Sequence, residues 1–324
     1  MKKLFIIIAL LFGRIFFLSA EEHKPPEPPK GYANMTLLKA AYFLHLLKLA
    51  DKKPSIPSEI IEYKDITYKQ TKSRPLKLDI YRLKTLPRPA PVLVFIHGGA
   101  WKKGDKSDYM RYLVDFAERG YVTATLSYRF SQEAPFPAAV KDVKCAIRWI
   151  KAHAREYFIN PEKIAVIGGS AGGHLAMMIG YSSDSPEFED ECAGVDSTIS
   201  SRVQAVVNFY GPSNLASDYA RKQPNVIKFI SKPADEAFQN YIKASPITYL
   251  TKDDPPTLIF HGTIDELVPV EQSDSLKAAL DRVGVAAEYH KLKGWPHTMD
   301  LALKVNKYCQ YYMNAFFKKY LGPE

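Results

Sequence analysis

Hydrophobic and polar residues follow two different periods from about Ile60 to the end of the chain. Stretches that alternate between apolar and polar residues, or are apolar throughout, predict strands, and apolar residues three or four positions apart predict helices. The predicted strands span 61–69, 76–83, 91–99, 121–130, 163–169, 202–212, 256–265 and 286–292. The predicted helices span 107–120, 136–158, the segment after Ser170, 273–284 and 301–320.

The order of these elements indicates the fold class. The first two strands alternate like an antiparallel pair, and after them strands alternate with helices, which favours a mostly parallel sheet with helices on both faces. Residues 216–246, between two predicted strands, are rich in charged residues and predict a small helical cap. We therefore expect an α/β fold, with one catalytic domain over residues 56–324.

Residues 1–55 follow a different pattern. Residues 1–20 have two lysines near the start, then an apolar run interrupted by Arg14, then small residues, which is typical of a secretory signal peptide. An uncleaved membrane anchor is the alternative. Residues 21–55 combine a proline-rich spacer with an amphipathic helix within 35–53 that we expect to pack against the main domain. The predicted location is secreted or periplasmic.

Composition narrows the class of protein. The chain has 324 residues, of which 46% are hydrophobic and 24% charged, as in soluble globular proteins. The formal net charge is +9, but lysine and arginine are scattered, so we expect no nucleic-acid partner. The three cysteines allow at most one disulfide, and their spacing suggests no metal site. No cofactor and no stable membrane partner are expected.

One glycine-rich turn carries the strongest chemical signal. Residues 168–172 read Gly-Gly-Ser-Ala-Gly, which fits G-x-S-x-G at the end of a strand and the start of a helix. This nucleophile elbow would hold the Ser170 hydroxyl clear of the sheet. A phosphate-binding turn is the alternative, but G-x-G-x-x-G is absent and no lysine follows as in a P-loop.

A serine nucleophile needs a base and an orienting acid, and on this fold they follow in the order Ser, Asp or Glu, His. Asp265 directly follows a predicted strand, and His297 lies in a loop past the last strand. We predict Asp265 as the acid and His297 as the base. The alternatives are Glu266, Asp253 and Asp254 for the acid, and His261 and His290 for the base. His290 falls within a strand and His261 precedes the acid, so both are expected to be structural.

The negative oxygen of a tetrahedral intermediate also needs hydrogen-bond donors. The sequence His97-Gly-Gly-Ala-Trp101 follows an apolar strand, and its glycines would let backbone N–H groups turn into the site. The N–H of Ala171, the residue after the nucleophile, would complete the oxyanion hole. We expect His97 to brace this loop and His174 to be a packing residue.

These motifs carry a family resemblance that covers roughly Ile60 to the C-terminus. Four segments of the chain resemble α/β-hydrolases of the hormone-sensitive-lipase-like esterase group. They read HGGAW, SYRFSQEAPFPAAVKDVKCAIRWIKAHA, INPEKIAVIGGSAGGHLA and GTIDELVPVEQSDSL. They are similar in particular to secreted bacterial esterases, some of which are assigned to acetylated or feruloylated xylan. The resemblance implies Ser170, His297 and Asp265 as the triad. It also implies an oxyanion hole from Gly99, Ala100 and Ala171, with Ala100 replacing the third glycine of lipase-type HGGG.

The predicted function is therefore a serine-dependent carboxylic ester hydrolase that needs no cofactor. We expect short acyl esters, possible examples being acetyl or feruloyl groups on plant polysaccharide, so the partner is a small-molecule or carbohydrate ester. The alternatives are an arylformamidase, amidase or lipase-type hydrolase on the same fold, and a non-catalytic binding module. The sequence does not indicate the oligomeric state.

Overall fold

The computed structural model describes residues 24–189 and 192–322, so the predicted signal segment 1–20 lies outside the described residues. Their central feature is an eight-stranded sheet in the order β1-β2-β4-β3-β5-β6-β7-β8. The strands are β1 (Ile60–Gln70), β2 (Pro75–Leu83), β3 (Ala90–Ile96), β4 (Val122–Leu126), β5 (Ile159–Gly169), β6 (Ala205–Phe209), β7 (Thr257–Gly262) and β8 (Ala287–Leu292).

The pairing of the strands confirms the predicted fold class. β2 runs antiparallel to both β1 and β4, whereas all neighbours from β4 to β8 are parallel. Because the strands from β3 onward are parallel, their carboxyl ends lie at one edge of the sheet, where α/β folds place their binding sites.

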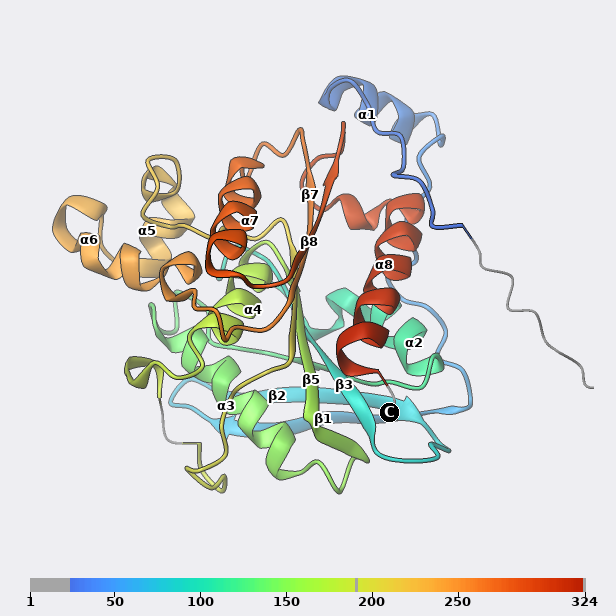
Figure 1. The fold of residues 1–324 in the computed structure, drawn as a ribbon, viewed down its shortest axis with the longest axis vertical. Coiled ribbons are helices and arrows are strands. Elements are labelled where there is room, and N and C mark those ends of the chain that lie inside the picture. The colour runs from blue at the N-terminus through green and yellow to red at the C-terminus, as the bar shows by residue number, and fades with distance from the viewer. Residues whose placement is uncertain (1–23, 190–191, 323–324) are drawn as a thin grey trace, which may run out of the picture.

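Helices cover both faces of this sheet (Figure 1). On one face lie α2 (Met110–Glu118) and α8 (Leu303–Leu321), and on the other α3 (Ala138–Ala152), α4 (Ala171–Tyr181) and α7 (Glu271–Val283). The short 3-10 segments are η1 (Lys106–Tyr109), η2 (Pro186–Phe188), η3 (Ala220–Lys222), η4 (Pro246–Tyr249) and η5 (Met299–Leu301).

The burial of β3 on both faces explains why its sequence is an unbroken apolar run. Val92, Val94 and Ile96 belong to the core under α3 and α4, and Leu93 and Phe95 belong to the core under α2 and α8. All five side chains are fully buried. A strand covered on both faces needs apolar residues at odd and even positions alike.

Several predicted helix boundaries were wrong, among them those of the helices expected over 136–158 and 301–320. The helix expected over 136–158 ends at Ala152, because Ile159 already pairs with Ala90 at the start of β5. The last helix begins at Leu303 rather than 301, since η5 occupies the residues before it. In both places tertiary pairing overrides a local helical pattern.

The predicted cap consists of α5 (Pro224–Ile230) and α6 (Ala234–Lys243), preceded by η3. Phe229 of α5 stacks on Trp101, with ring centroids 4.4 Å apart. The cap is therefore attached to the loop that follows β3.

The N-terminal residues 24–53 cross the α8 face and include α1 (Met35–Phe43). The indole of Trp295 donates to the Pro29 carbonyl at 2.8 Å, and the Tyr312 hydroxyl donates to the Pro26 carbonyl at 3.2 Å. This segment packs against the main domain, as expected. Among the described helices, none is long and apolar enough to cross a membrane.

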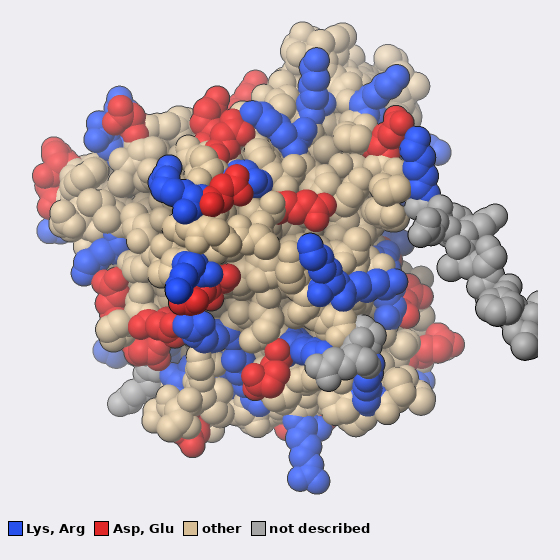
Figure 2. Space-filling view, in the orientation of Figure 1, with Lys and Arg blue, Asp and Glu red and all other residues tan. Residues whose placement is uncertain are grey.

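One disulfide joins Cys145 of α3 to Cys192, and Cys309 of α8 is buried with a free thiol. Acidic and basic side chains are interspersed over the face of the molecule that Figure 2 presents. Within residues 24–189 and 192–322, no group of three or more His, Cys, Asp and Glu side chains could hold a metal ion.

Candidate active site

Ser170 lies at the junction between β5 and α4, as the elbow motif predicts. Its backbone has φ 56° and ψ −122°, a conformation that few residues other than glycine adopt. The Ser170 N–H donates to the Phe209 carbonyl at 2.9 Å and ties the turn to β6. The strained turn thus sits at the carboxyl edge of the sheet.

Two glycines make this turn possible. A Cβ atom on Gly168 would lie 2.3 Å from the carbonyl group of Gly172, and a Cβ on Gly172 would lie 2.0 Å from the Ile96 carbonyl oxygen. The crossing of β5, α4 and β3 therefore leaves no room for side chains at these positions. This close approach is the physical reason for the glycines of the motif.

Asp265 and His297 meet in the loops that follow β7 and β8. The His297 Nδ1 and Asp265 Oδ2 atoms are 2.7 Å apart, and Oδ1 accepts the N–H groups of Leu267 and Val268, both at 2.9 Å. The Asp265 side chain is fully buried. Burial alone would raise the pKa of its carboxyl, but hydrogen bonds from His261 and His297 outweigh burial and hold the pKa well below its usual range.

His261 contacts the acid rather than the serine. Its Nε2 atom lies 3.2 Å from Asp265 Oδ2 and 2.9 Å from the Val268 carbonyl oxygen, and its Nδ1 atom lies 2.7 Å from the Ser273 hydroxyl. The only signal for this contact in the sequence is that His261 lies four positions before Asp265. Its role in the fold is to hold the carboxylate in place.

The other candidates for acid and base lie elsewhere. Asp254 accepts the Thr251 N–H at 2.7 Å, and Glu266 is exposed to solvent. His290 lies 2.7 Å from both the Tyr308 hydroxyl and a Glu288 carboxylate oxygen. None of the three is paired with His297.

The loop after β3 offers backbone donors to the same cavity. Gly99, Ala100 and Trp101 all have positive φ, at 104°, 54° and 55°. The N–H groups of Gly99 and Ala100 donate no hydrogen bond within the described residues. Ala171 is the first residue of α4, where an N–H has no acceptor inside the helix.

Buried aromatic and histidine side chains fix this loop. The Trp101 indole N–H donates to His174 Nδ1 at 3.2 Å, and the Tyr128 hydroxyl donates to the His97 carbonyl at 3.0 Å. Burial lowers the pKa of His174 to about 4, so its ring is neutral at pH 7. His97 and His174 thus brace the loop rather than face the serine.

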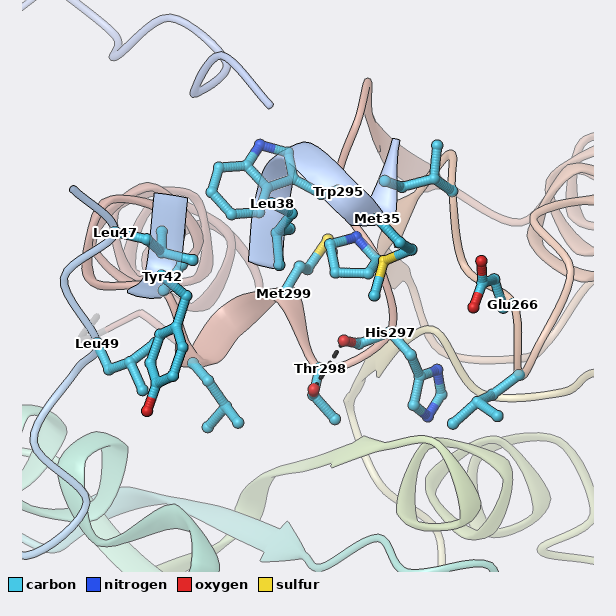
Figure 3. Close-up of a pocket in the computed structure, with 15 residues that line it drawn as sticks. Met35, Leu38, Tyr42, Leu47, Leu49, Glu266, Trp295, His297, Thr298 and Met299 are labelled. Carbon is cyan, nitrogen blue, oxygen red and sulfur yellow. Dashed lines mark hydrogen bonds between the residues drawn. The ribbon is translucent and has the colours of Figure 1, made fainter. Parts of the chain in front are cut away.

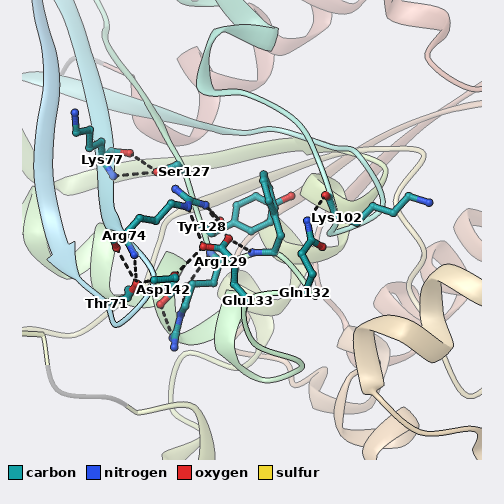
Figure 4. A network of polar contacts seen from close by, with 12 residues as sticks. Thr71, Arg74, Lys77, Lys102, Ser127, Tyr128, Arg129, Gln132, Glu133 and Asp142 are labelled. Carbon is teal, nitrogen blue, oxygen red and sulfur yellow. Dashed lines mark hydrogen bonds and ion pairs between the residues drawn. The ribbon is translucent and has the colours of Figure 1, made fainter.

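A network of ion pairs supports the segment on which Tyr128 lies (Figure 4). The Arg74 guanidinium binds both oxygens of Glu133 at 2.9 and 3.0 Å, and Arg129 binds both oxygens of Asp142 at 2.8 and 2.7 Å. Two-point pairs of this kind fix orientation as well as distance. Through Tyr128, the network therefore supports the loop that follows β3.

Ser170 and His297 line two adjoining cavities. The smaller, of about 120 Å³, lies between the loop that follows β3 and the cap, and its lining includes Ala100, Trp101, Ala171, Tyr219, Ala220, Val226 and Leu267. The larger, of about 580 Å³, is an open cleft whose lining includes Lys52, Gly99, Lys102, Lys103, Asp108, Tyr109, Tyr210 and Asp300. The lysine and tyrosine residues of this cleft belong to no motif in the sequence, so they could not be predicted from it.

A third cavity, of about 460 Å³, lies on the other side of the His297 loop (Figure 3). Met35, Leu38 and Leu47 of the N-terminal segment line it together with Met299 and His297. The sequence predicted that this segment packs on the main domain, but not that it packs beside the candidate base. Only the long-range contacts of the fold show this.

Taken together, the candidate site has a hydroxyl on a strained turn, an imidazole, a buried carboxylate and free backbone donors. Groups of this kind perform acyl transfer in serine hydrolases, where the imidazole moves the proton and the N–H groups stabilise the oxyanion. The arrangement contains the chemical groups that hydrolysis of an ester or amide requires.

Comparison with known proteins identifies a family and several similar esterases. Residues 78–280, more than half of the chain, match the BD-FAE family. The probable carboxylic ester hydrolase LipM of Mycobacterium tuberculosis is 35% identical over 246 residues, which cover 73% of this chain and 56% of LipM. The chain thus spans little more than half the length of this relative.

Solved structures agree with the sequence matches. A truncated carbohydrate esterase from gut microbiota has a TM-score of 0.71 at 26% identity, covering 82% of this chain and 99% of that one. A thermophilic esterase from Thermogutta terrifontis has a TM-score of 0.69 at 26% identity, covering 82% of this chain and 95% of that one.

Proposed function

The chain belongs to the BD-FAE family of α/β-hydrolases, and from this premise we propose that it hydrolyses carboxylic esters with Ser170 as nucleophile. The observation that carries the proposal is the 2.7 Å contact between His297 Nδ1 and the buried Asp265 carboxylate, in the loop that shares a cavity with Ser170. A non-catalytic binding module, the alternative without a covalent step, does not explain why the strained Ser170 and His297 line the same cavity.

In the proposed reaction, the Ser170 hydroxyl attacks the ester carbonyl while His297 Nε2 accepts its proton. The tetrahedral intermediate then collapses, and His297 returns the proton to the departing alcohol, which leaves an acyl group on Ser170. Water then attacks the acyl carbon while His297 Nε2 takes its proton. The bond from the acyl carbon to the Ser170 oxygen breaks, His297 returns the proton to that oxygen, and the carboxylic acid is released.

Asp265 and the backbone donors complete this scheme. The carboxylate accepts the Nδ1–H of His297, so that Nε2 is the nitrogen that is free to take a proton. Because hydrogen bonds hold the pKa of Asp265 well below its usual range, the carboxylate stays ionised while the imidazole is charged. The N–H groups of Gly99, Ala100 and Ala171 are proposed to bind the oxyanion.

The finer part of the proposal is the substrate, a short acyl group on a polar alcohol such as a sugar. The chamber of about 120 Å³ between Ala100 and the cap favours a small acyl group. The open cleft of about 580 Å³ presents lysine, tyrosine and carboxylate groups, which suit an alcohol with several hydroxyls. The similarity to a carbohydrate esterase supports the same choice.

We further propose that the protein is exported. Residues 1–20 have the pattern of a signal peptide, and disulfides such as Cys145–Cys192 persist mainly in oxidising compartments. Export suits an enzyme that meets polysaccharide outside the cytoplasm.

The test is a comparison of kcat/KM over a series of nitrophenyl esters from acetate to palmitate, a formanilide, and acetylated and feruloylated xylan oligosaccharides. We expect the highest value among the nitrophenyl esters on acetate, and release of acetate or ferulate from the oligosaccharides. A maximum on long-chain esters without release from the sugars would contradict the substrate proposal, and a preference for the formanilide would contradict ester hydrolysis as the main reaction.

A further inference from the structure

The N-terminal arm, defined here as residues 35–49, carries a cluster of exposed apolar side chains that the proposed reaction does not use. The cluster consists of Leu37, Tyr42, Phe43, Leu44, Leu46 and Leu49. Phe43 and Leu46 keep 76% and 74% of their surface exposed. Single exposed apolar residues are ordinary, but a contiguous group of this size in one short segment marks a surface that binds a partner.

The arm is held to the body of the protein by its inner side. Ala41 and Leu47 are buried, the Ala50 N–H donates to the Leu301 carbonyl at 2.8 Å, and the Leu303 N–H donates to the Lys48 carbonyl at 2.9 Å. These contacts fix which residues of the arm face outward. The exposed cluster is therefore presented in a defined orientation.

Lysines surround the cluster. Lys39, Lys48, Lys52 and Lys53 are all exposed, and Asp51 is the one acidic residue between positions 35 and 53. No carboxylate of the described residues lies within ion-pair distance of any of these four lysines. At the top of Figure 2, where Figure 1 places α1, uncharged side chains at the tip stand beside basic ones.

We propose that the arm docks on the surface of a lipid bilayer with anionic headgroups. Phe43, Leu44 and Leu46 would enter the boundary between headgroups and acyl chains, and the lysines would contact the headgroups. A second copy of the chain fits less well, because two-fold pairing of this patch would bring the lysines of both copies together. The proposal departs from the expectation, drawn from the sequence, of no stable membrane partner.

Docking would also orient the candidate site. Tyr42 and Leu49 belong to the exposed cluster and line the cavity beside His297, so this cavity opens toward the docked surface. The docking itself does not depend on the reaction proposed for Ser170, and the two proposals can fail separately.

The test uses the full chain with vesicles of phosphatidylglycerol or of phosphatidylcholine, separated by sedimentation. We expect at least about tenfold tighter partition onto phosphatidylglycerol, weakening as salt is raised. The combined Phe43→Ser, Leu44→Ser and Leu46→Ser variant should lose about tenfold or more of this partition. It should still hydrolyse a soluble acetate ester at the normal rate. The matched control is Phe238→Ser, an exposed aromatic residue on α6, which should bind like the unchanged protein.

A local fluorescence signal separates the arm from any other segment that binds lipid. In the Phe43→Trp variant, anionic vesicles should shift the emission to shorter wavelength and brominated lipid should quench it, whereas Phe238→Trp should show neither effect. Unchanged emission from Phe43→Trp on sedimented protein would overturn the proposal, as would equal binding by the triple variant. Self-association in analytical ultracentrifugation that the triple variant abolishes would instead assign the patch to a second copy.

Discussion

At the scale of single residues, Asp265 differs from its neighbour Glu266 in burial and in its contact with His297. Its carboxylate is buried and contacts His297, whereas Glu266 is exposed and has no such contact. In the amide variant the oxygen would keep the backbone N–H groups of Leu267 and Val268, so the NH2 group would face His297 and donate to Nδ1, which gives the wrong tautomer. We expect Asp265→Asn to lower kcat on a nitrophenyl acetate by roughly 10³- to 10⁴-fold.

The control for this variant is Glu266→Gln, which should stay within about twofold of the unchanged protein. A larger loss of kcat from Glu266→Gln than from Asp265→Asn would show that Asp265 is not the catalytic acid. Both variants should be checked for an unchanged urea midpoint, since Asp265 also accepts backbone N–H groups of its own loop.

Asp254 gives a prediction about stability rather than catalysis. Burial raises the pKa of its carboxyl from 3.8 to about 6. Between those values the folded protein keeps a proton that the unfolded chain releases, so this group stabilises the fold at low pH and loses that effect as pH rises toward 6. In urea unfolding, Asp254→Asn should gain stability relative to the unchanged protein as pH rises from 4 to 6. The exposed neighbour Asp253 serves as control, and the same trend in Asp253→Asn would contradict the assignment.

At the scale of elements, the elbow depends on how closely α4 approaches β3. A Cβ on Gly172 would lie 2.0 Å from the Ile96 carbonyl oxygen, and backbone cannot move aside at low cost. We expect Gly172→Ala to lower the free energy of unfolding by about 3 kcal/mol or more and to abolish hydrolysis. Gly120→Ala, at a positive φ with open space around it, should cost only about 1 kcal/mol. Equal losses in the two variants would show that the crossing tolerates a side chain.

Elements that are marked by a local pattern in the sequence could be predicted from it. The run Val92–Ile96 is apolar at every position because both of its faces are covered, so pattern alone identifies the strand. The elbow is a motif of five consecutive residues, and the order Ser170, Asp265, His297 can be read along the chain, so both could be predicted. The structure has Asp265 and His297 in contact.

Features that depend on contacts between residues far apart in the sequence could not be predicted. The placement of the N-terminal residues 24–53 beside the His297 loop rests on contacts such as that between Trp295 and Pro29, which are 266 positions apart. The end of α3 at Ala152 follows from the pairing of Ile159 with Ala90, although the helical pattern continues past it. No local pattern in the sequence specifies either contact.

At the scale of the whole molecule, the Cys145–Cys192 disulfide closes a loop of 47 positions between α3 and the segment before β6. A closed loop of this length contributes about 4 kcal/mol if the effect is chiefly on the unfolded chain. Thiol titration of the denatured protein should give one thiol, from Cys309, before reduction and three after it. Reduction should also shift the urea midpoint downward. Three reactive thiols before reduction would contradict the disulfide and weaken the argument for export.

The most direct test of the central claim is covalent labelling of the nucleophile. A fluorophosphonate should react with the Ser170 hydroxyl, releasing fluoride and forming a single phosphonyl ester that peptide mass spectrometry locates on Ser170. Labelling should abolish ester hydrolysis in proportion to its extent, and Ser170→Ala should neither label nor hydrolyse. Ser201 is a buried serine that lines neither of the cavities shared by Ser170 and His297, so Ser201→Ala should do both normally. An adduct on another residue, or ester hydrolysis that persists in Ser170→Ala, would contradict the account.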